Sequence, residues 1–267
     1  MFWAGRDNLE EIASLGVRCG QLGIPGDLDL HEGAAREWKS ALEEAGFTLV
    51  TVFAAYQGED YADIPTVQRT VGFIPYDTRE RREQRTYEVS DFAAAIGVGS
   101  VATHVGFIPE DNTHPDYVAV REMVRRVADH AARYRQTFAL ETGQEPAHVL
   151  QRFLKDVSRP NVGINFDPAN MILYGTGDPI EALSTLGPLV LSVHMKDGDW
   201  PPSNRAEALG RERPLGQGIV GIPRFVQKLQ EIGFRGPLNI EREAENQQER
   251  IADIRNAVTY LKKSWSI

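Results

Sequence analysis

The chain has 267 residues, of which 42% are hydrophobic and 25% charged, and its formal net charge is −9. This composition is typical of a folded globular protein with enough apolar residues for a large core, and the acidic balance argues against nucleic-acid binding, which needs a basic face. The single cysteine, Cys19, excludes an internal disulfide and a cysteine-based zinc site.

The first residues contain no basic patch followed by an apolar stretch. No run approaches the ~20 apolar residues that cross a bilayer. We therefore expect a cytoplasmic protein with no membrane partner and no nucleic-acid partner. The length suits a single domain over residues 1–267, either alone or as a homo-oligomer.

Short runs of β-branched and aromatic residues alternate with longer amphipathic stretches along the chain. A stub at 2–4 leads into a helix over 8–15. Further strands are predicted over 17–22, 47–54, 100–105, 137–141, 162–167, 189–195 and 237–241. The clearest other helices are predicted over 33–45, 116–134 and 222–232.

Strands that alternate with helices favour a parallel sheet with crossover helices. Seven clear strands plus the stub predict a (β/α)8 TIM barrel whose first strand is short or truncated, and such barrels take ~250 residues. The alternative is an open doubly wound sheet, which would carry a glycine-rich nucleotide-binding turn after an early strand. The early segment GQLGIPGD does not match that turn, so the closed barrel is the better interpretation.

Two polar segments interrupt the repeat. Residues 198–221 are rich in glycine, proline and charge, and we expect a long loop there of the kind that is often functional. Residues 57–86 are expected to form a loop and then a charged helix.

Four polar residues stand at the ends of four predicted strands: Glu141, Asp167, His194 and Glu241. They recur once per strand–helix repeat when the loop after His194 is set aside, so they should meet at the mouth of the barrel, where barrel enzymes keep their sites. A single acidic residue there is more often a helix cap or a salt-bridge partner. Three acids gathered in a buried mouth need a compensating cation, so the set of four predicts a divalent metal site.

These segments resemble the xylose-isomerase-like TIM barrel superfamily, which includes sugar-phosphate isomerases and epimerases, ketose 3-epimerases and inosose-processing enzymes. The matching segments are LETGQE (140–145), NFDPAN (165–170), SVHMKD (192–197), PLGQG (214–218) and PLNIERE (237–243). The resemblance implies that Glu141, Asp167, His194 and Glu241 bind one divalent ion. It also implies that the two glutamates serve as the acid and base. Ketose 3-epimerases tend to place a histidine where this chain has Asn170, so the resemblance leaves the sugar open.

The ion is expected to be Mn²⁺ first, with Mg²⁺, Co²⁺ or Zn²⁺ as options, because carboxylates with one imidazole suit these metals. The hypothesis is a sugar isomerase or epimerase that acts through a metal-stabilised enediolate, with Glu141 and Glu241 moving the proton. A small-molecule sugar is the expected partner.

Further residues are predicted to contact the substrate: His104, Gln144, Asn170 and Lys196. Glu243 shares strand alternation with Glu241 and is the alternative ligand. Arg205, Arg211 and Arg213 could form an anion clamp on the long loop, although a solvated charged loop is the simpler interpretation.

Two other functions remain open at this stage. A lyase or dehydratase acting on a keto-sugar, keto-glycoside or keto-inositol would use the same metal site and the same first proton abstraction. A non-catalytic sugar-binding barrel is the other alternative, and the presence of both glutamates argues against it.

Overall fold

The computed structural model describes residues 1–205 and 207–265. Eight parallel strands follow one another around a curled sheet in the order β1-β2-β3-β4-β5-β6-β7-β10. These strands are β1 (Phe2–Trp3), β2 (Cys19–Ile24), β3 (Thr48–Ala54), β4 (Ser100–Thr103), β5 (Thr137–Glu141), β6 (Val162–Phe166), β7 (Val190–Met195) and β10 (Leu238–Ile240). The Met1 amino group donates a hydrogen bond to the Ile240 carbonyl oxygen, which brings the two edges of the sheet together. The predicted (β/α)8 TIM barrel with a short first strand is confirmed.

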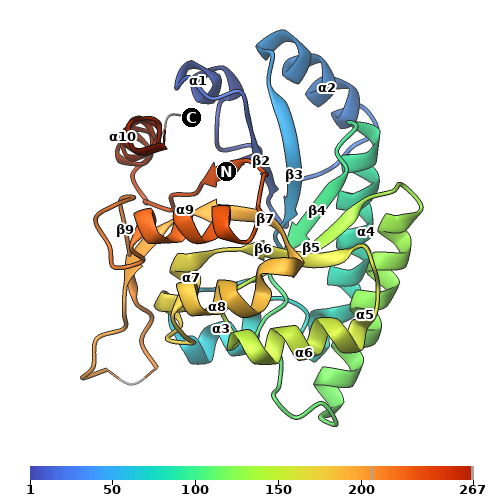
Figure 1. Cartoon of the computed structure of the whole chain (residues 1–267). Helices are drawn as coiled ribbons and strands as arrows, with labels where there is room; N and C mark the ends of the chain where they lie inside the picture. The colour runs from blue at the N-terminus through green and yellow to red at the C-terminus, as the bar shows by residue number, and fades with distance from the viewer. Residues whose placement is uncertain (206, 266–267) are drawn as a thin grey trace.

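Helices lie along the outside of the sheet, as Figure 1 shows for α4, α5, α6, α8 and α9. The helices are α1 (Leu9–Ser14), α2 (Ala34–Ala45), α3 (Ile64–Thr70), α4 (Arg79–Ala95), α5 (Pro115–Ala132), α6 (Ala147–Val157), α7 (Pro168–Leu173), α8 (Pro179–Leu186), α9 (Ile222–Glu231) and α10 (Gln247–Trp265). Several begin with a proline in the first turn and an aspartate cap, as α3 and α8 do. Among the described residues, no helix is both long and apolar enough to cross a membrane.

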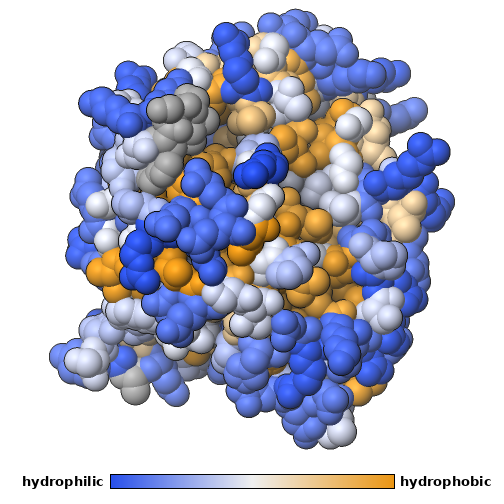
Figure 2. Space-filling view, viewed as in Figure 1, coloured by the Kyte–Doolittle hydropathy of each residue, from blue (hydrophilic) through white to orange (hydrophobic). Residues whose placement is uncertain are grey.

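The sheet has an outer apolar face and an inner face of mixed character. Outward residues such as Leu140 and Phe166 belong to the main core, and Phe166 stacks on Phe225 of α9 with ring centroids 5.8 Å apart. Figure 2 shows apolar residues gathered towards the middle of one face, while hydrophilic residues cover much of its outline. Burial of these strands between helices and barrel interior explains their near-continuous apolar sequences.

The predicted strands and helices are found, with ends that shift by at most two residues. The strand predicted over 17–22 is displaced to Cys19–Ile24, and the strand predicted over 162–167 stops at Phe166. It stops there because Asp167 leaves the sheet to cap α7, accepting a hydrogen bond from Asn170 N. The strand predicted over 100–105 likewise ends at Thr103, so His104 lies in the following loop.

The two polar interruptions contain more structure than expected. Residues 57–86 hold α3, a 3₁₀ turn (Tyr76–Thr78) and the start of α4. The prediction of one long loop over 198–221 is wrong, because β8 (Asp197–Asp199) and β9 (Arg211–Arg213) pair as an antiparallel ribbon. The Asp197 carboxylate also fixes the residues that follow the ribbon by accepting backbone hydrogen bonds from Gly216, Gly218 and Val220.

Candidate metal centre

The predicted metal ligands meet at the carboxyl ends of neighbouring strands. Glu141 is the last residue of β5, His194 lies in β7, and Glu241 directly follows β10. Asp167 follows β6, and its Oδ1 accepts from Asn170 N at 2.9 Å. All four side chains are buried, and one ligand atom of each lies within 4.8 Å of the others. We call these four residues the ligand group.

The His194 imidazole lies among the three acids. Its Nδ1 is 2.9 Å from Glu141 Oε1, 3.1 Å from Glu241 Oε2 and 3.5 Å from Asp167 Oδ2. Donor atoms that share one divalent ion at ~2.0–2.4 Å can lie at most about 4–5 Å apart. The spacing of the ligand group therefore suits a single ion.

The Asp167 carboxylate supplies a further test of that fit. Its Oδ2 is buried and makes no hydrogen bond among the described residues, and its cationic contacts are long, to His194 Nδ1 at 3.5 Å and to Lys196 Nζ at 3.8 Å. A buried charged acceptor without a hydrogen bond costs more than the ~1–3 kcal/mol of a neutral one, and two more acids stand beside it. A divalent ion would compensate this crowding, and the donor set of carboxylates with one imidazole suits Mn²⁺, Mg²⁺, Co²⁺ or an expanded Zn²⁺ site. The residues fit the predicted metal.

The acids stand in unlike electrostatic environments. Burial raises the pKa of Glu141 and of Asp167 above their usual values, although nearby cationic groups oppose it. Burial acts on Glu241 in the same direction, but His194 and Lys196 outweigh it and hold the pKa of Glu241 well below its usual value. Burial disfavours the charged His194 imidazole, yet Glu141 and Glu241 raise its pKa well above the usual range. The ligand group therefore stabilises a positive charge placed among its carboxylates.

A second layer of polar side chains orients the His194 ring. Gln21 Oε1 lies 2.8 Å from His194 Nε2, and Gln21 Nε2 donates to Asn165 Oδ1 at 3.0 Å. Asn165 Oδ1 also accepts from Ser192 Oγ, while Asn165 Nδ2 donates to Glu141 Oε2. A bound metal would need the neutral imidazole, and a ring proton kept on Nε2 by Gln21 Oε1 would then leave the Nδ1 lone pair facing the acids.

This second layer was missed from the sequence, although strand alternation carries a signal for part of it. Asn165 and Ser192 stand two positions before Asp167 and His194, so they lie on the same face of their strands. Gln21 has no ligand near it in sequence. The sequence gives one sign of its role: Gln21 is a polar residue in a short apolar strand, where a buried polar group needs a hydrogen-bond partner.

Two of the four predicted substrate contacts, Lys196 and Asn170, touch the ligand group itself. Lys196 Nζ lies 3.0 Å from Glu241 Oε2 and 3.1 Å from Glu243 Oε2, and it donates to Asn170 Oδ1 at 3.4 Å. Asn170 Nδ2 donates to Glu141 Oε1 at 3.3 Å. The Glu243 side chain is 54% exposed and lies outside the ligand group, so Glu241 is the better placed of the two candidate ligands.

The other two predicted contacts, His104 and Gln144, pair with each other. Gln144 Nε2 lies 3.2 Å from His104 Nδ1, and Gln144 Oε1 is buried without a hydrogen-bond partner among the described residues. Burial lowers the pKa of His104, although Glu141 opposes the shift, so this imidazole is neutral at pH 7. An unpartnered amide oxygen is a ready acceptor for a ligand hydroxyl.

A series of aromatic rings, of which the sequence analysis singled out only His104, leads to the ligand group from the other side. Phe53 of β3 lies 6.2 Å from the His194 ring and 5.5 Å from the His104 ring, centroid to centroid. Trp3 lies 6.5 Å from Phe53, and Tyr61 lies 5.8 Å from His104. We call Trp3, Phe53, His104 and Tyr61 the aromatic wall.

The ribbon of β8 and β9 brings the acidic residue Glu212 close to Lys196 and does not form the predicted anion clamp of arginines. Arg213 pairs with Asp199 within the ribbon, Nε to Oδ2 at 2.6 Å. Among the ion pairs of the described residues, none joins Arg205, Arg211 or Arg213 to the ligand group. Glu212 is largely buried, and burial raises its pKa to about 7, with Lys196 opposing.

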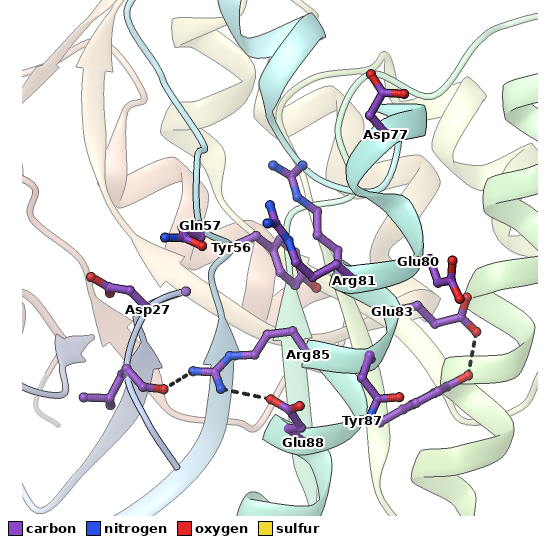
Figure 3. Close-up of a pocket in the computed structure, with 14 residues that line it drawn as sticks. Asp27, Tyr56, Gln57, Asp77, Glu80, Arg81, Glu83, Arg85, Tyr87 and Glu88 are labelled. Carbon is purple, nitrogen blue, oxygen red and sulfur yellow. Dashed lines mark hydrogen bonds and ion pairs between the residues drawn. The ribbon is translucent and has the colours of Figure 1, made fainter. Parts of the chain in front are cut away.

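A separate cavity of about 810 Å³ lies against α4 and is shown in Figure 3. Its wall includes Asp27, Tyr56, Arg85 and Glu88, and it contains none of the ligand group. The Arg85 guanidinium is already engaged there, because its Nη2 donates to the carbonyl oxygens of Pro25 and Leu28 and its Nη1 to Glu88. These bonds hold the loop after β2 on α4, which is a structural role.

Comparison with known proteins agrees with the fold. Residues 9–264 match the family model described as a xylose isomerase-like TIM barrel. The crystal structure of a xylose isomerase domain protein from Planctomyces limnophilus is 41% identical, with a TM-score of 0.94 over 98% of this chain and 94% of that one.

More distant structures share the fold. The 3-keto-D-glucoside 4-epimerase YcjR from E. coli is 17% identical, with a TM-score of 0.67 over 96% of this chain and 92% of that one. The probable 3-DHS dehydratase AsbF from Bacillus anthracis is 16% identical, with a TM-score of 0.68 over 97% and 94%. An uncharacterised curated protein from Methanocaldococcus jannaschii is 25% identical over 156 residues, and the match spans about half of that relative's length (50%).

Proposed function

The chain belongs to the xylose isomerase-like TIM barrel family, and from that premise we propose that it is a divalent-metal-dependent isomerase or epimerase of a small sugar. The observation that carries the proposal is the buried group of Glu141, Asp167, His194 and Glu241. Three buried acids, one of them with a carboxylate oxygen that makes no hydrogen bond, are costly in a folded protein unless they bind a cation. The family match over residues 9–264 also supports treating the whole chain as one domain.

When bound, the ion would polarise a substrate carbonyl and stabilise negative charge on its oxygen, and the oxygen-rich donor set supports Mn²⁺ as first choice. Glu241 is the proposed base, because the Lys196 ammonium 3.0 Å away favours its ionised form. Glu141 is the proposed acid, because two amides, of Asn165 and Asn170, orient its carboxyl group instead of a lysine. Return of the proton to the other face of the same carbon is epimerisation, and return to the neighbouring carbon is isomerisation.

The remaining polar groups are proposed to orient the sugar. Gln144 Oε1 is free to accept a hydroxyl proton, and the neutral His104 ring beside it can accept or donate. Lys196 contacts Glu241 and Asn170 contacts Glu141, so the two can hold a hydroxyl between them. These four residues make the second part of the proposal.

A lyase acting on a keto-sugar is the second candidate, favoured by the likeness to the AsbF dehydratase. Abstraction of the proton beside a carbonyl would be the same step, and expulsion of a β-leaving group would follow it. The mass of the product separates the two reactions, since elimination changes it and epimerisation does not.

The test is to replace Glu141 and Glu241 separately with glutamine and to screen the manganese-loaded proteins with ketoses and keto-glycosides. Each variant is expected to lose about 10²–10⁴-fold in turnover, the usual contribution of one acid or base, while metal content is measured in parallel. Glu88→Gln on α4, where Glu88 pairs with Arg85 far from the ligand group, is the control. Full turnover by both glutamine variants with metal bound would refute the acid–base roles. No metal and no turnover in the parent protein would favour a sugar-binding barrel.

A further inference from the structure

The four ligands do not receive equal support from the sheet. β5, β6 and β7 are each paired with a strand on both sides, and they carry or lead into Glu141, Asp167 and His194. β10 has three residues and, in the part of the chain that the structure describes, pairs with β7 alone. Glu241 follows it outside the sheet, where its N–H donates to the Met195 carbonyl oxygen at 3.2 Å. A carboxylate carried beyond so short an edge strand needs further contacts to keep its place.

The middle residue of the ribbon strand β9 supplies such contacts. The Glu212 carboxylate accepts a hydrogen bond from Glu243 N, which lies 3.1 Å from Oε2 and 3.2 Å from Oε1. Its Oε2 also lies 3.0 Å from Arg242 Nη1, and both of these side chains are largely buried. One acid of the ribbon thus binds the two residues that directly follow Glu241. We call Glu212 and Arg242 the clamp.

The clamp ties the residues after Glu241 to the strand of another ligand. β8 starts two positions after the end of β7, so the ribbon continues the strand that carries His194. Glu212 is held in register on β8. Arg242 Nε donates to the Asp253 carboxylate of α10 at 2.8 Å, and ribbon and α10 lie on the same side of the barrel (Figure 1). The residues after Glu241 are therefore fixed between an extension of the His194 strand and α10.

An acid at this place is unfavourable in itself. Burial raises the pKa of Glu212 to about 7, and the nearby Glu243 carboxylate acts in the same direction, although Lys196 and Arg242 oppose them. A buried acid beside other acids costs electrostatic free energy unless specific partners favour its charge. The partners that Glu212 gains are the Arg242 guanidinium and Glu243 N, and both belong to the segment that follows Glu241.

We propose that Glu212 is a positioning residue, which holds the Glu241 carboxylate in place among the ligand group through Arg242 and the Glu243 backbone. The inference rests on the proposed function only in taking Glu241 as a metal ligand and base. Side chains of a metal site must be held within about 0.5 Å of the productive geometry. Loss of the clamp frees the segment after Glu241 from the ribbon, so it should weaken metal binding through this one ligand.

The test measures the Mn²⁺ affinity of the full chain by calorimetric titration, so it does not depend on turnover. Glu212→Ala is expected to raise the manganese Kd about tenfold, the lower end of the effect of losing a supporting contact around a metal site. Glu212→Gln keeps an acceptor for Glu243 N but loses the charge opposite Arg242, so about a threefold rise is expected. Asp199→Asn is the matched control and should leave the Kd unchanged, because Asp199 belongs to the same ribbon but pairs with Arg213.

Double variants separate the positioning of Glu241 from a general loss of order. The effect of Glu212→Ala should disappear when it is combined with Glu241→Gln, because the carboxylate that it positions is gone, and should persist with Glu141→Gln. Equal effects in both pairs would overturn the inference. So would a folded Glu212→Ala protein, or a folded Glu212→Gln protein where alanine prevents folding, that binds Mn²⁺ as tightly as the parent. The expected affinities without turnover of any sugar would uphold the inference and count against the proposed function.

Discussion

Replacement of Gln21 by leucine tests whether the second layer holds the metal ligand in place. Gln21 is fully buried, its Oε1 lies 2.8 Å from His194 Nε2, and its Nε2 donates to Asn165 Oδ1 at 3.0 Å. Leucine has a similar size but neither group. The substitution therefore removes the hydrogen bond that fixes the imidazole tautomer and leaves the volume of the site nearly unchanged.

Two effects of different size follow. Loss of the partner of a metal-bound imidazole typically weakens metal affinity 10–100-fold, or about 1.4–2.8 kcal/mol. The metal-free protein should also lose ~1–3 kcal/mol in its free energy of unfolding, because His194 Nε2 is left buried without its acceptor. Asn165 Oδ1 keeps its hydrogen bond from Ser192 Oγ, so its share of the loss is smaller.

Calorimetric titration with Mn²⁺ and urea denaturation of the metal-free protein measure the two effects. Gln136→Leu is the matched control, because Gln136 is equally buried and bonds Ser90 and the Val98 carbonyl oxygen, away from the ligand group. It should destabilise the fold and leave the manganese Kd unchanged. A Gln21→Leu protein that folds and binds Mn²⁺ within twofold of the parent would show that Gln21 does not position His194.

Two further predictions concern stability. Asp197→Ala should lower the free energy of unfolding, measured by urea denaturation, by at least ~2 kcal/mol, because the buried Asp197 carboxylate accepts several backbone N–H groups. Asp199→Ala is the control, because it removes a half-exposed ion pair worth ~1 kcal/mol or less. Equal losses in the two variants would contradict the prediction. Burial raises the pKa of Glu145 from 4.5 to about 8. Between these two pH values the folded state keeps a proton that the unfolded chain loses, so the free energy of unfolding falls as the pH rises from 4.5 to about 8. Glu145→Gln should therefore raise Tm at pH 8 but not at pH 4.5, and parallel Tm profiles of the two proteins would refute this.

The ligand group could be predicted from the sequence because its residues recur once in each strand–helix repeat. Each ligand lies at the end of an apolar strand or directly beside that end, and strand ends of a parallel barrel share one mouth, so the four ligands needed no long-range information. The contact between Gln21 and His194 joins residues 173 positions apart. It depends on how the barrel closes, which local patterns do not specify.

The ribbon was missed for a different reason. β8 and β9 have only three residues each, and β9 lies between Gly210 and Pro214, so neither shows the alternation that identifies a strand. The Asp197 carboxylate fixes the residues that follow the ribbon, and its acceptor role appears only when Gly216 and Gly218 fold back over it. The aromatic wall was missed because Trp3, Phe53 and Tyr61 look like ordinary core or loop residues until the barrel brings them together.

The division of the barrel interior into an acidic arc and a mainly apolar arc follows from where the ligands stand in the strand order. Because β5, β6, β7 and β10 are adjacent in the sheet, the acids crowd one arc and repel one another there. The strands from β1 to β4 can then carry mainly apolar inward side chains, although Gln21 of β2 reaches His194, and Gly23 makes room for the Trp3 ring on that arc. Acids spread evenly around the barrel would each need separate compensation and would leave no continuous apolar surface. Concentration of charge on one arc thus permits both one-ion binding and an apolar wall facing it.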